Sequence, residues 1–391
     1  MTRDIQRITR GAVLLALGGV AWLGANATNE GHSAEVRFAG SIQLDELLVP
    51  TDDRPRDFVF DGFTTELSMK LSVDVSREIS AQVKTCYGCH GFELGAAYVD
   101  FRPYDALRIR AGRFTPTFGD FPLRHDPANH LTSDKPLPYD MGRMLRLREF
   151  NMSILPAPYV DNGLEVSFAQ SLGDSADLDV HAYVIGGLRA GSGATDVDFI
   201  QSRSRELYYV DNNSQPTVGG RVAASFFLGP DAALTIGASG MYGTYDPDNR
   251  LDLLVLGADL VLRIERWALR VEYLLRRTRM DLGSDPSEGF RYGVGADGRY
   301  DPYALKDGFY AETTFPIGDH VEIVGRVDGM RRQGNVPKAS PLRSESAILR
   351  YTVGGVLRLA DRWRIKLSGE LYDFSDFEDE VGIHLGVVGA F

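Results

Sequence analysis

The chain contains two cysteines, and they stand three positions apart in front of a histidine, as Cys86-Tyr87-Gly88-Cys89-His90. This spacing is typical of c-type haem attachment, in which both sulfurs form thioethers and the histidine binds the iron. His90 would then be the proximal ligand. The residues that could supply a second iron ligand follow in a later segment: His125, His130, Met141 and Met144.

The same two cysteines allow other chemistry. Residues three apart in an extended strand point to opposite faces, so haem attachment and a Cys86–Cys89 disulfide both require a turn, which Gly88 and Gly91 permit. A disulfide would stiffen a tight hairpin and suits an oxidising compartment. Free thiols or a metal site are a third possibility, but two Cys and one His leave a metal one ligand short, and no metal is predicted.

A second group of residues could act through charge. Arg and Lys alternate with apolar residues in several segments, and such side chains favour anions where they line an aqueous pore. The candidate pore-lining cations are Lys70, Lys84, Arg108, Arg110, Arg270, Arg276, Arg326, Arg364 and Lys366. Set against five acids in the same inward positions (Glu66, Glu272, Glu322, Asp328 and Glu370), these nine cations leave an excess of four and predict a preference for anions.

A long connection over about 116–158 is the candidate constriction. It is rich in proline and carries four further cations, Arg124, Arg143, Arg146 and Arg148. Loops of this length without secondary structure are usually functional. Folded into a pore, the segment would narrow it and add positive charge; the alternative is a loop on the outer surface.

The elements that must position these residues are predicted to be long strands. In the segment 363–372, Ile365 and Leu367 lie on one face and Arg364, Lys366 and Glu370 on the other. The predicted spans are 35–47, 58–74, 79–87, 92–102, 106–115, 160–171, 177–187, 216–229, 233–244, 250–264, 267–278, 306–316, 320–332, 346–359, 363–374 and 381–391. Many have about ten residues or more, the length that crosses a bilayer as a tilted strand.

The connections between these strands alternate between short turns and longer polar segments. This arrangement predicts an all-β fold: a transmembrane antiparallel β-barrel of about sixteen strands with short periplasmic turns and longer extracellular loops. Trp267 and Trp363 each follow a short turn, where an interfacial aromatic girdle is expected. The last strand ends in Phe391, which resembles the C-terminal signature of bacterial outer-membrane proteins.

The N-terminus predicts export. Residues 1–27 combine arginines, an apolar run and Ala25-Asn26-Ala27, as in a cleaved signal peptide, which leaves 28–391 as the barrel. Loss of three arginines and Asp4 with this segment would change the net charge from −12 to −14. So acidic a protein is a poor nucleic-acid binder. Beyond residue 27 there is no apolar stretch long enough for a transmembrane helix.

The segments Ala97-Tyr98-Val99-Asp100-Phe101-Arg102-Pro103 and Leu107-Arg108-Ile109-Arg110-Ala111-Gly112-Arg113-Phe114-Thr115-Pro116-Thr117-Phe118-Gly119 resemble the phosphate-selective porin O/P family. The resemblance implies a sixteen-stranded channel that forms a homotrimer, with an inward-folded third loop and Arg or Lys in the lumen.

Together these features predict a porin-like channel of the bacterial outer membrane, embedded in lipid, for passive diffusion of small solutes or ions, with anions preferred. The alternative is a barrel that carries covalent haem c and transfers electrons or senses redox state. An enzyme is not predicted, because Gly-x-Ser-x-Gly and His-Glu-x-x-His motifs are absent from the sequence.

Overall fold

The structure is a computed structural model that describes residues 34–48, 62–88, 91–140, 153–190, 199–200, 211–279, 281–282, 291–292, 303–334, 347–375 and 378–391. The predicted signal peptide, 1–27, lies outside these residues. So do Cys89, His90, Met141 and Met144, together with Arg143, Arg146 and Arg148 of the predicted constriction loop.

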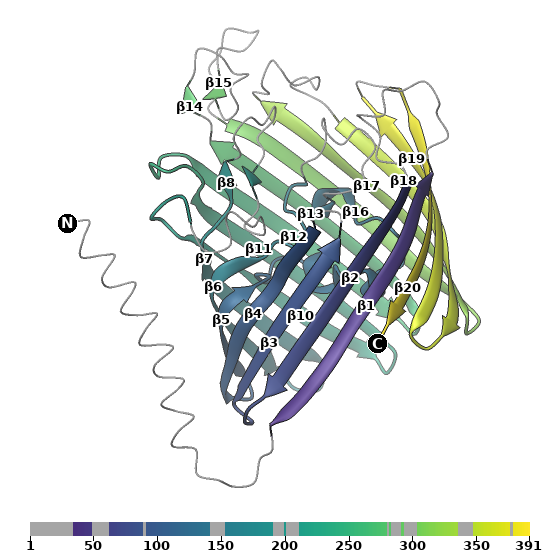
Figure 1. The fold of residues 1–391 in the computed structure, drawn as a ribbon, viewed down its shortest axis with the longest axis horizontal. Helices are drawn as coiled ribbons and strands as arrows, with labels where there is room; N and C mark the ends of the chain where they lie inside the picture. Colours follow the sequence, from purple (N-terminus) through teal and green to yellow (C-terminus); the bar gives the residue numbers. More distant parts are fainter. Residues whose placement is uncertain are drawn as a thin grey trace, which may run out of the picture.

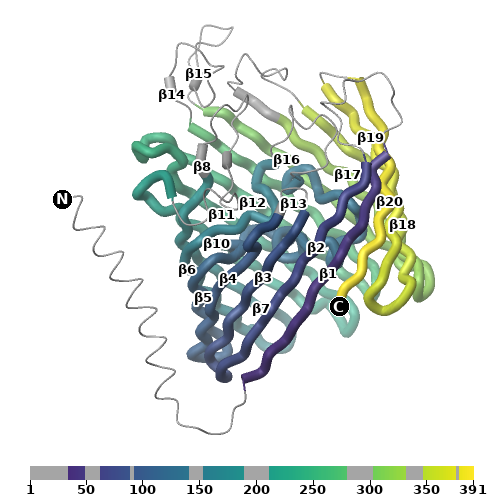
Figure 2. Tube along the Cα trace, viewed as in Figure 1, coloured from purple at the N-terminus to yellow at the C-terminus, as the bar shows by residue number. Residues whose placement is uncertain are grey.

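The chain forms one closed barrel of sixteen strands in which neighbours along the chain pair antiparallel (Figure 1). The last strand pairs with the first, from Ser41↔Ala390 to Leu48↔Ile383, and closes the cylinder (Figure 2). The predicted sixteen-stranded antiparallel barrel is therefore confirmed. The barrel strands are β1 (Glu35–Leu48), β2 (Gly62–Asp74), β3 (Ile79–Gly88), β4 (Gly91–Tyr104), β5 (Leu107–Phe114), β6 (Asp161–Ser171), β7 (Ala176–Ile185), β10 (Thr217–Gly229), β11 (Ala232–Thr244), β12 (Asp252–Ile264), β13 (Trp267–Arg279), β16 (Tyr303–Ile317), β17 (Val321–Gly334), β18 (Ala347–Ala360), β19 (Trp363–Phe374) and β20 (Glu380–Ala390).

Side chains alternate between the lumen and the outer surface because successive residues of a strand point to opposite faces. In β19, Lys366 and Glu370 point inward and are 1% and 2% exposed, whereas Leu367 and Leu371 point outward and are 54% and 43% exposed. Residues opposite each other on neighbouring strands share a face, so the register carries this alternation around the cylinder. The charged residues of β19 named here thus face the interior.

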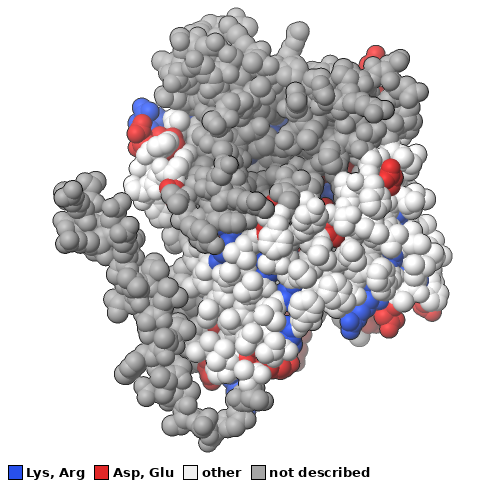
Figure 3. Space-filling model, in the orientation of Figure 1, with Lys and Arg blue, Asp and Glu red and all other residues white. Residues whose placement is uncertain are grey.

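The outer surface is mainly apolar. Figure 3 shows one face of the barrel, where most of the described wall is uncharged and Lys, Arg, Asp and Glu are visible in small groups at its edges and along its middle. Trp267 and Trp363 both face outward at the start of a strand that follows a two-residue turn. Phe391 packs on Phe38 of the first strand with ring centroids 5.8 Å apart. An apolar exterior on a closed barrel suits the hydrocarbon core of a bilayer.

The two rims differ. Seven connections of two to four residues lie on one rim, and on the other rim most connections are longer. The hairpin between β3 and β4 is the exception, because only Cys89 and His90 separate Gly88 from Gly91. The long connections also contain two small sheets, one of β8 (Arg189–Ala190) and β9 (Phe199–Ile200) and one of β14 (Asp281–Leu282) and β15 (Arg291–Tyr292). No helix in the described part of the chain is long and apolar enough to cross a membrane.

The connection between β5 and β6 turns into the barrel. Its described part has some structure of its own, which the sequence did not predict: the 3-10 turns η2 (Phe121–Arg124), η3 (Pro127–Asn129) and η4 (Leu137–Tyr139). Its apolar side chains form a buried cluster with inward residues of the wall, including Phe121, Tyr139 and Tyr310, all 0% exposed. We call the described residues 115–140 and 153–160 the inward loop.

Candidate functional site

The inward loop is held to one side of the lumen by carboxylates of the wall. Glu272 of β13 accepts hydrogen bonds from the backbone N–H groups of Asp120 and Phe121, the latter at 2.9 Å. In the same way Glu165 of β6 accepts from Thr117 at 2.8 Å, and Asp328 of β17 accepts from Leu137 at 2.8 Å. These contacts are needed because an irregular loop buried inside a barrel leaves N–H groups without secondary-structure partners.

Cations of the wall satisfy the loop carbonyls in turn. Lys366 Nζ donates to Pro127 O at 2.6 Å, and Arg326 Nη1 donates to Asp134 O at 3.1 Å. Two further wall cations make the same kind of contact: Arg276 with Ser153 O and Ile154 O, both at 3.3 Å, and Arg364 with Ala128 O at 3.1 Å. Four of the nine predicted pore-lining cations therefore bind the loop backbone.

Aromatic packing completes this sealed side. Phe121 stacks on Tyr139 with ring centroids 5.3 Å apart, and the edge of Tyr310 meets Phe121 at 6.3 Å. Arg124, predicted to add positive charge to a constriction, lies between Asp120 at 2.9 Å and Glu312 at 3.6 Å. Its charge is neutralised locally by these two acids.

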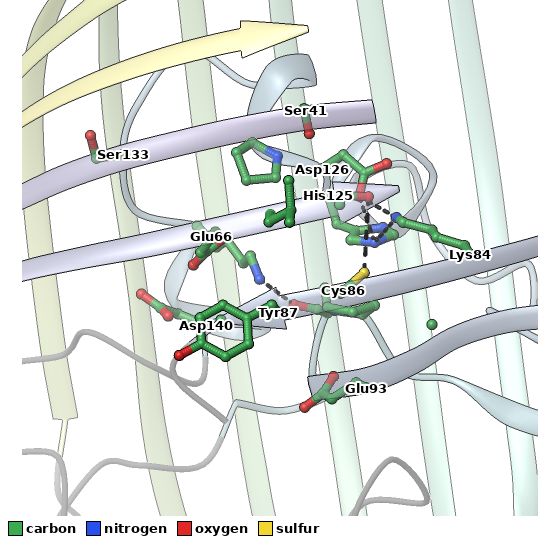
Figure 4. A pocket seen from close by; sticks show the side chains of 18 of the residues that line it. Ser41, Glu66, Lys84, Cys86, Tyr87, Glu93, His125, Asp126, Ser133 and Asp140 are labelled. Carbon is green, nitrogen blue, oxygen red and sulfur yellow. Dashed lines mark hydrogen bonds and ion pairs between the residues drawn. The ribbon is translucent and has the colours of Figure 1, made fainter. Parts of the chain in front are cut away.

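The opposite side of the lumen is open. A cavity of about 110 Å³ lies between the inward loop and strands β1 to β4 (Figure 4). Lys84 and Cys86 of β3 point into it from the wall, and His125 and Asp126 point into it from the loop. Lys84 forms an ion pair with Asp126, and its Nζ lies 3.5 Å from His125 Nε2. The loop is thus tethered to β3 by one charge pair across the cavity.

Burial decides the charge of the histidine in this cavity. It lowers the pKa of His125 to about 4, against the opposing attraction of Asp126. Burial also acts against ionisation of Asp126, but the charges of His125 and Lys84 outweigh it and lower the pKa of Asp126 to about 2. At neutral pH the group is therefore a neutral imidazole beside a Lys–Asp ion pair.

A second cavity, of about 150 Å³, is lined by residues nearer the short turns, on β1 to β5. Arg110 of β5 donates to both carboxylate oxygens of Asp100, at 2.8 and 2.9 Å, and its guanidinium lies 3.9 Å from the ring centre of Tyr98. Arg108 donates to Ser167 Oγ at 3.1 Å. We call this the arginine cavity; the charged residues that line it are Arg37, Arg102, Arg108, Arg110, Asp74 and Asp100.

The charge of the wall as a whole differs from the count made on the sequence. The count omitted inward acids that the register places in the lumen: Asp45, Asp100, Asp161, Glu165, Asp259, Glu312 and Glu380, all buried. It also omitted the inward cations Arg221, Lys306 and Arg350, and Arg37 and Arg102 of the arginine cavity. The excess of four positive charges therefore does not describe the wall, and the local charge at each cavity is the better guide.

The remaining predicted residues divide between the two sides. Lys70 lies on the inward face opposite Lys84, Arg108 and Arg110 line the arginine cavity, and Arg270 approaches Glu312 at 3.8 Å. Of the predicted haem residues, Cys86 and His125 line the same cavity. His130 is buried elsewhere, with Nδ1 2.8 Å from Thr132 O.

Sequence reasoning missed Arg350, Asp134 and His384, three fully or almost fully buried residues on the sealed side. Arg350 and His384 could have been found, because both stand at inward positions of predicted strands. Asp134 could not have been found in this way, because it belongs to the inward loop and lies beside β19 and β20 only because of the path that the loop takes.

No family model matches the chain, and no curated protein matches its sequence. Solved structures do match it. The outer membrane channel DcaP of Acinetobacter baumannii superposes with a TM-score of 0.55 at 10% identity, covering 93% of this chain and 99% of that one. A loop L8 deletion mutant of OmpT, an outer membrane protein of Vibrio cholerae, gives 0.54 at 11% identity (92% and 100%), and an anion-selective porin from Comamonas acidovorans gives 0.52 at 13% (92% and 100%).

The chain has the porin fold. The sixteen closed strands, the unequal rims and the apolar exterior are those of a bacterial outer-membrane barrel. A porin fold with a loop packed along one side of its lumen leaves a path only where the wall and the loop do not touch. Two cavities of the described residues, both along β1 to β5, lie in such a space.

Proposed function

We propose that this protein is a passive diffusion channel for small solutes in the outer membrane, and that solutes pass along β1 to β5. The observation that carries the proposal is the asymmetry of the lumen. The inward loop is bonded to the wall along β13 and β16 to β20, whereas two cavities lie along β1 to β5. Narrowing of a wide barrel by an inward loop limits the size of what can diffuse.

Anions are the preferred solutes in this proposal, and the arginine cavity is the reason. Four guanidinium groups and two carboxylates line it. The cavity nearer the long loops has five acids, Glu66, Glu93, Asp126, Asp134 and Asp140. Three of them have close cationic partners: Asp126 pairs with Lys84, and Asp134 and Asp140 approach Arg350 Nη1 at 3.3 and 3.7 Å. In the arginine cavity, Arg37 pairs with Asp74 and Arg110 with Asp100, and the lining still has two more guanidinium groups than carboxylates. This local excess is what supports the preference for anions.

The test is current through the purified protein in a planar bilayer with a KCl gradient. We expect an open channel whose reversal potential indicates anion selectivity, and we expect the Arg108→Gln/Arg110→Gln double variant to lose much of that selectivity. Arg266→Gln is the matched control, because Arg266 sits in a turn at the rim. Cation selectivity of the unchanged protein would refute the anion preference, and absence of any conductance would refute the channel.

A barrel with covalent haem is the second candidate function. It is supported by the Cys86-x-x-Cys89-His90 spacing, and by the position of Cys86 in a cavity shared with His125. A Soret band in protein produced together with a cytochrome maturation system would support it, and the Cys86→Ser/Cys89→Ser variant should lose the band. The disulfide would be favoured if the unchanged protein shows no Soret band and its cysteines react with a thiol-labelling reagent only after reduction.

A homotrimer is proposed as the assembled form. One solved neighbour, OmpT of Vibrio cholerae, is described in a trimer form. Light scattering of the detergent-solubilised protein, with the detergent mass subtracted, distinguishes a trimer from a monomer.

A further inference from the structure

Three potential metal-ligand side chains meet on the sealed side of the lumen. Asp134 comes from the inward loop, Glu370 from β19 and His384 from β20, and all three are buried. His384 Nε2 lies 3.2 Å from Asp134 Oδ2 and 3.3 Å from Glu370 Oε2. The side chain of His384 is 0% exposed.

The contacts of His384 are close but are not hydrogen bonds. Neither ring nitrogen has a hydrogen-bond partner among the described residues, although both carboxylate oxygens lie within bonding distance of Nε2. The three ligand atoms lie within 4.8 Å of one another. An imidazole enclosed by carboxylates in this way either forms ion pairs with them or shares a metal ion with them.

We propose that Asp134, Glu370 and His384 bind a divalent metal ion of the Zn²⁺ class. Bonds of about 2.0–2.2 Å from Zn²⁺ to imidazole nitrogen and carboxylate oxygen place tetrahedral ligand atoms roughly 3.3–3.6 Å apart, close to the separations from Nε2. Three protein ligands leave a fourth position for water. Ca²⁺ fits less well because it takes six to eight oxygen ligands.

The charge around the three residues favours a cation. Arg350 Nη1 lies 3.3 Å from Asp134 Oδ2, and Arg326 Nη2 lies 3.8 Å from Glu370 Oε1, so two ligands already have cationic neighbours. Yet these two guanidinium groups share a larger set of carboxylates: Asp134, Asp140, Asp328, Glu312 and Glu370. Asp45 adds another acid, 3.7 Å from His384 Nδ1. Arg124 and Arg270 also approach Glu312, at 3.6 and 3.8 Å, so six carboxylates face four guanidinium groups. A dication would reduce this excess of negative charge.

The metal would fasten the inward loop to the seam where the barrel closes. β20 pairs with β1 at this seam, and Gly386 of β20 allows a close approach there. A Cβ at position 386 would lie 2.9 Å from both Ser133 Oγ and Asp45 Oδ1. The missing side chain lets the loop segment that carries Asp134 lie against β20, which places Asp134 next to His384.

Zinc content measures this proposal directly. The protein is purified in detergent, stripped with EDTA, dialysed against Zn²⁺ and analysed for metal after gel filtration. Because Cys86, Cys89 and His90 could bind zinc themselves, all variants carry Cys86→Ser and Cys89→Ser. We expect about one zinc per chain and a raised Tm in this background, as for any ligand that binds the folded state alone.

His384→Gln should abolish both the zinc and the rise in Tm, whereas the matched control His181→Gln should keep them. His181 of β7 also faces the lumen, but its Nδ1 already lies 2.9 Å from the Oγ of Ser167 on β6. If His384→Gln does not fold, Asp134→Asn tests the same site from the loop without altering the wall. Zinc that stays in both variants, or no zinc in the background protein, would overturn the proposal and leave His384 as a protonated partner of the acids.

Discussion

The two sides of the lumen contain the same kinds of residue and use them differently. Along β13 and β16 to β20, charged side chains of the wall bind the backbone of the inward loop, and Arg350, Lys366 and Asp328 are at most 1% exposed. Along β1 to β5, Arg37 and Arg102 keep about half of their side-chain surface and line a cavity. The loop lies against one wall and leaves the other.

This difference teaches that an inward charge in a barrel is not by itself a pore charge. On the sealed side the charges replace the hydrogen bonds that a loop without regular structure lacks. On the open side they face the passage and act on solutes. Variants of the two sides should therefore fail in different assays, the first in stability and the second in permeation.

The largest expected effect is on the sealed side. Asp328→Ala removes the nearest of the four carboxylates around Arg350, whose Nη2 lies 2.6 Å from Asp328 Oδ2, and it removes the acceptor of the Leu137 N–H. Leaving a buried charge without its partner typically costs about 3–5 kcal/mol. We expect a loss of that size in the free energy of unfolding, measured with urea in detergent or lipid vesicles.

The control for this variant is Asp319→Ala, which removes an exposed partner of Arg266 on the rim of short turns. It should change stability little, because exposed ion pairs contribute little. Equal losses in the two variants would contradict the structural role assigned to the sealed side.

A smaller loss is expected from Gly119→Ala in the inward loop. Gly119 has φ +63°, a conformation that residues with a Cβ rarely adopt, and a Cβ there would overlap the hydroxyl of Tyr139. We expect roughly 1–3 kcal/mol of destabilisation and noisier single-channel currents as the loop shifts. Gly173→Ala, at φ +75° with nothing near its Cβ, gives the cost of the conformation without the overlap.

The pH dependence of the open side should be weaker. Because folding lowers the pKa of His125 to about 4, protonation favours the unfolded chain, where a histidine titrates near 6.5. The stability that neutral His125 contributes is present above about pH 6.5 and is lost as the pH falls towards 4. His125→Gln should reduce this acid-side loss by about 1 kcal/mol. An unchanged pH profile of unfolding would show that His125 is exposed to water.

The smallest effect concerns selectivity. Asp126→Asn removes the acid that neutralises Lys84 and should leave a free positive charge in the cavity nearer the long loops. We expect an increase of about twofold in the anion-to-cation permeability ratio from reversal potentials. Asp319→Asn serves as the control, because Asp319 lies on the rim of short turns, away from this cavity. An unchanged permeability ratio would mean that this cavity is not on the path of the solute.

The sequence determined the barrel itself. Period-two alternation, as in the segment 363–372, gave the sixteen strands and placed residues such as Lys84, Arg270 and Lys366 on the inward face. This succeeds because a strand in a membrane barrel has one apolar and one polar face, so the polarity of each side chain indicates the face on which it lies. The same alternation placed Arg350 and His384 inward, although their importance did not follow from it.

Only the tertiary structure decided which inward charges meet the loop and which meet the passage. Lys366 and Arg108 have the same pattern in sequence, yet Lys366 Nζ donates to Pro127 O and Arg108 lines the arginine cavity. The position of Asp134 beside Glu370 and His384 depends on contacts between residues more than two hundred positions apart. Local patterns record the environment of one strand, whereas the path of a loop through the lumen results from many distant contacts acting together.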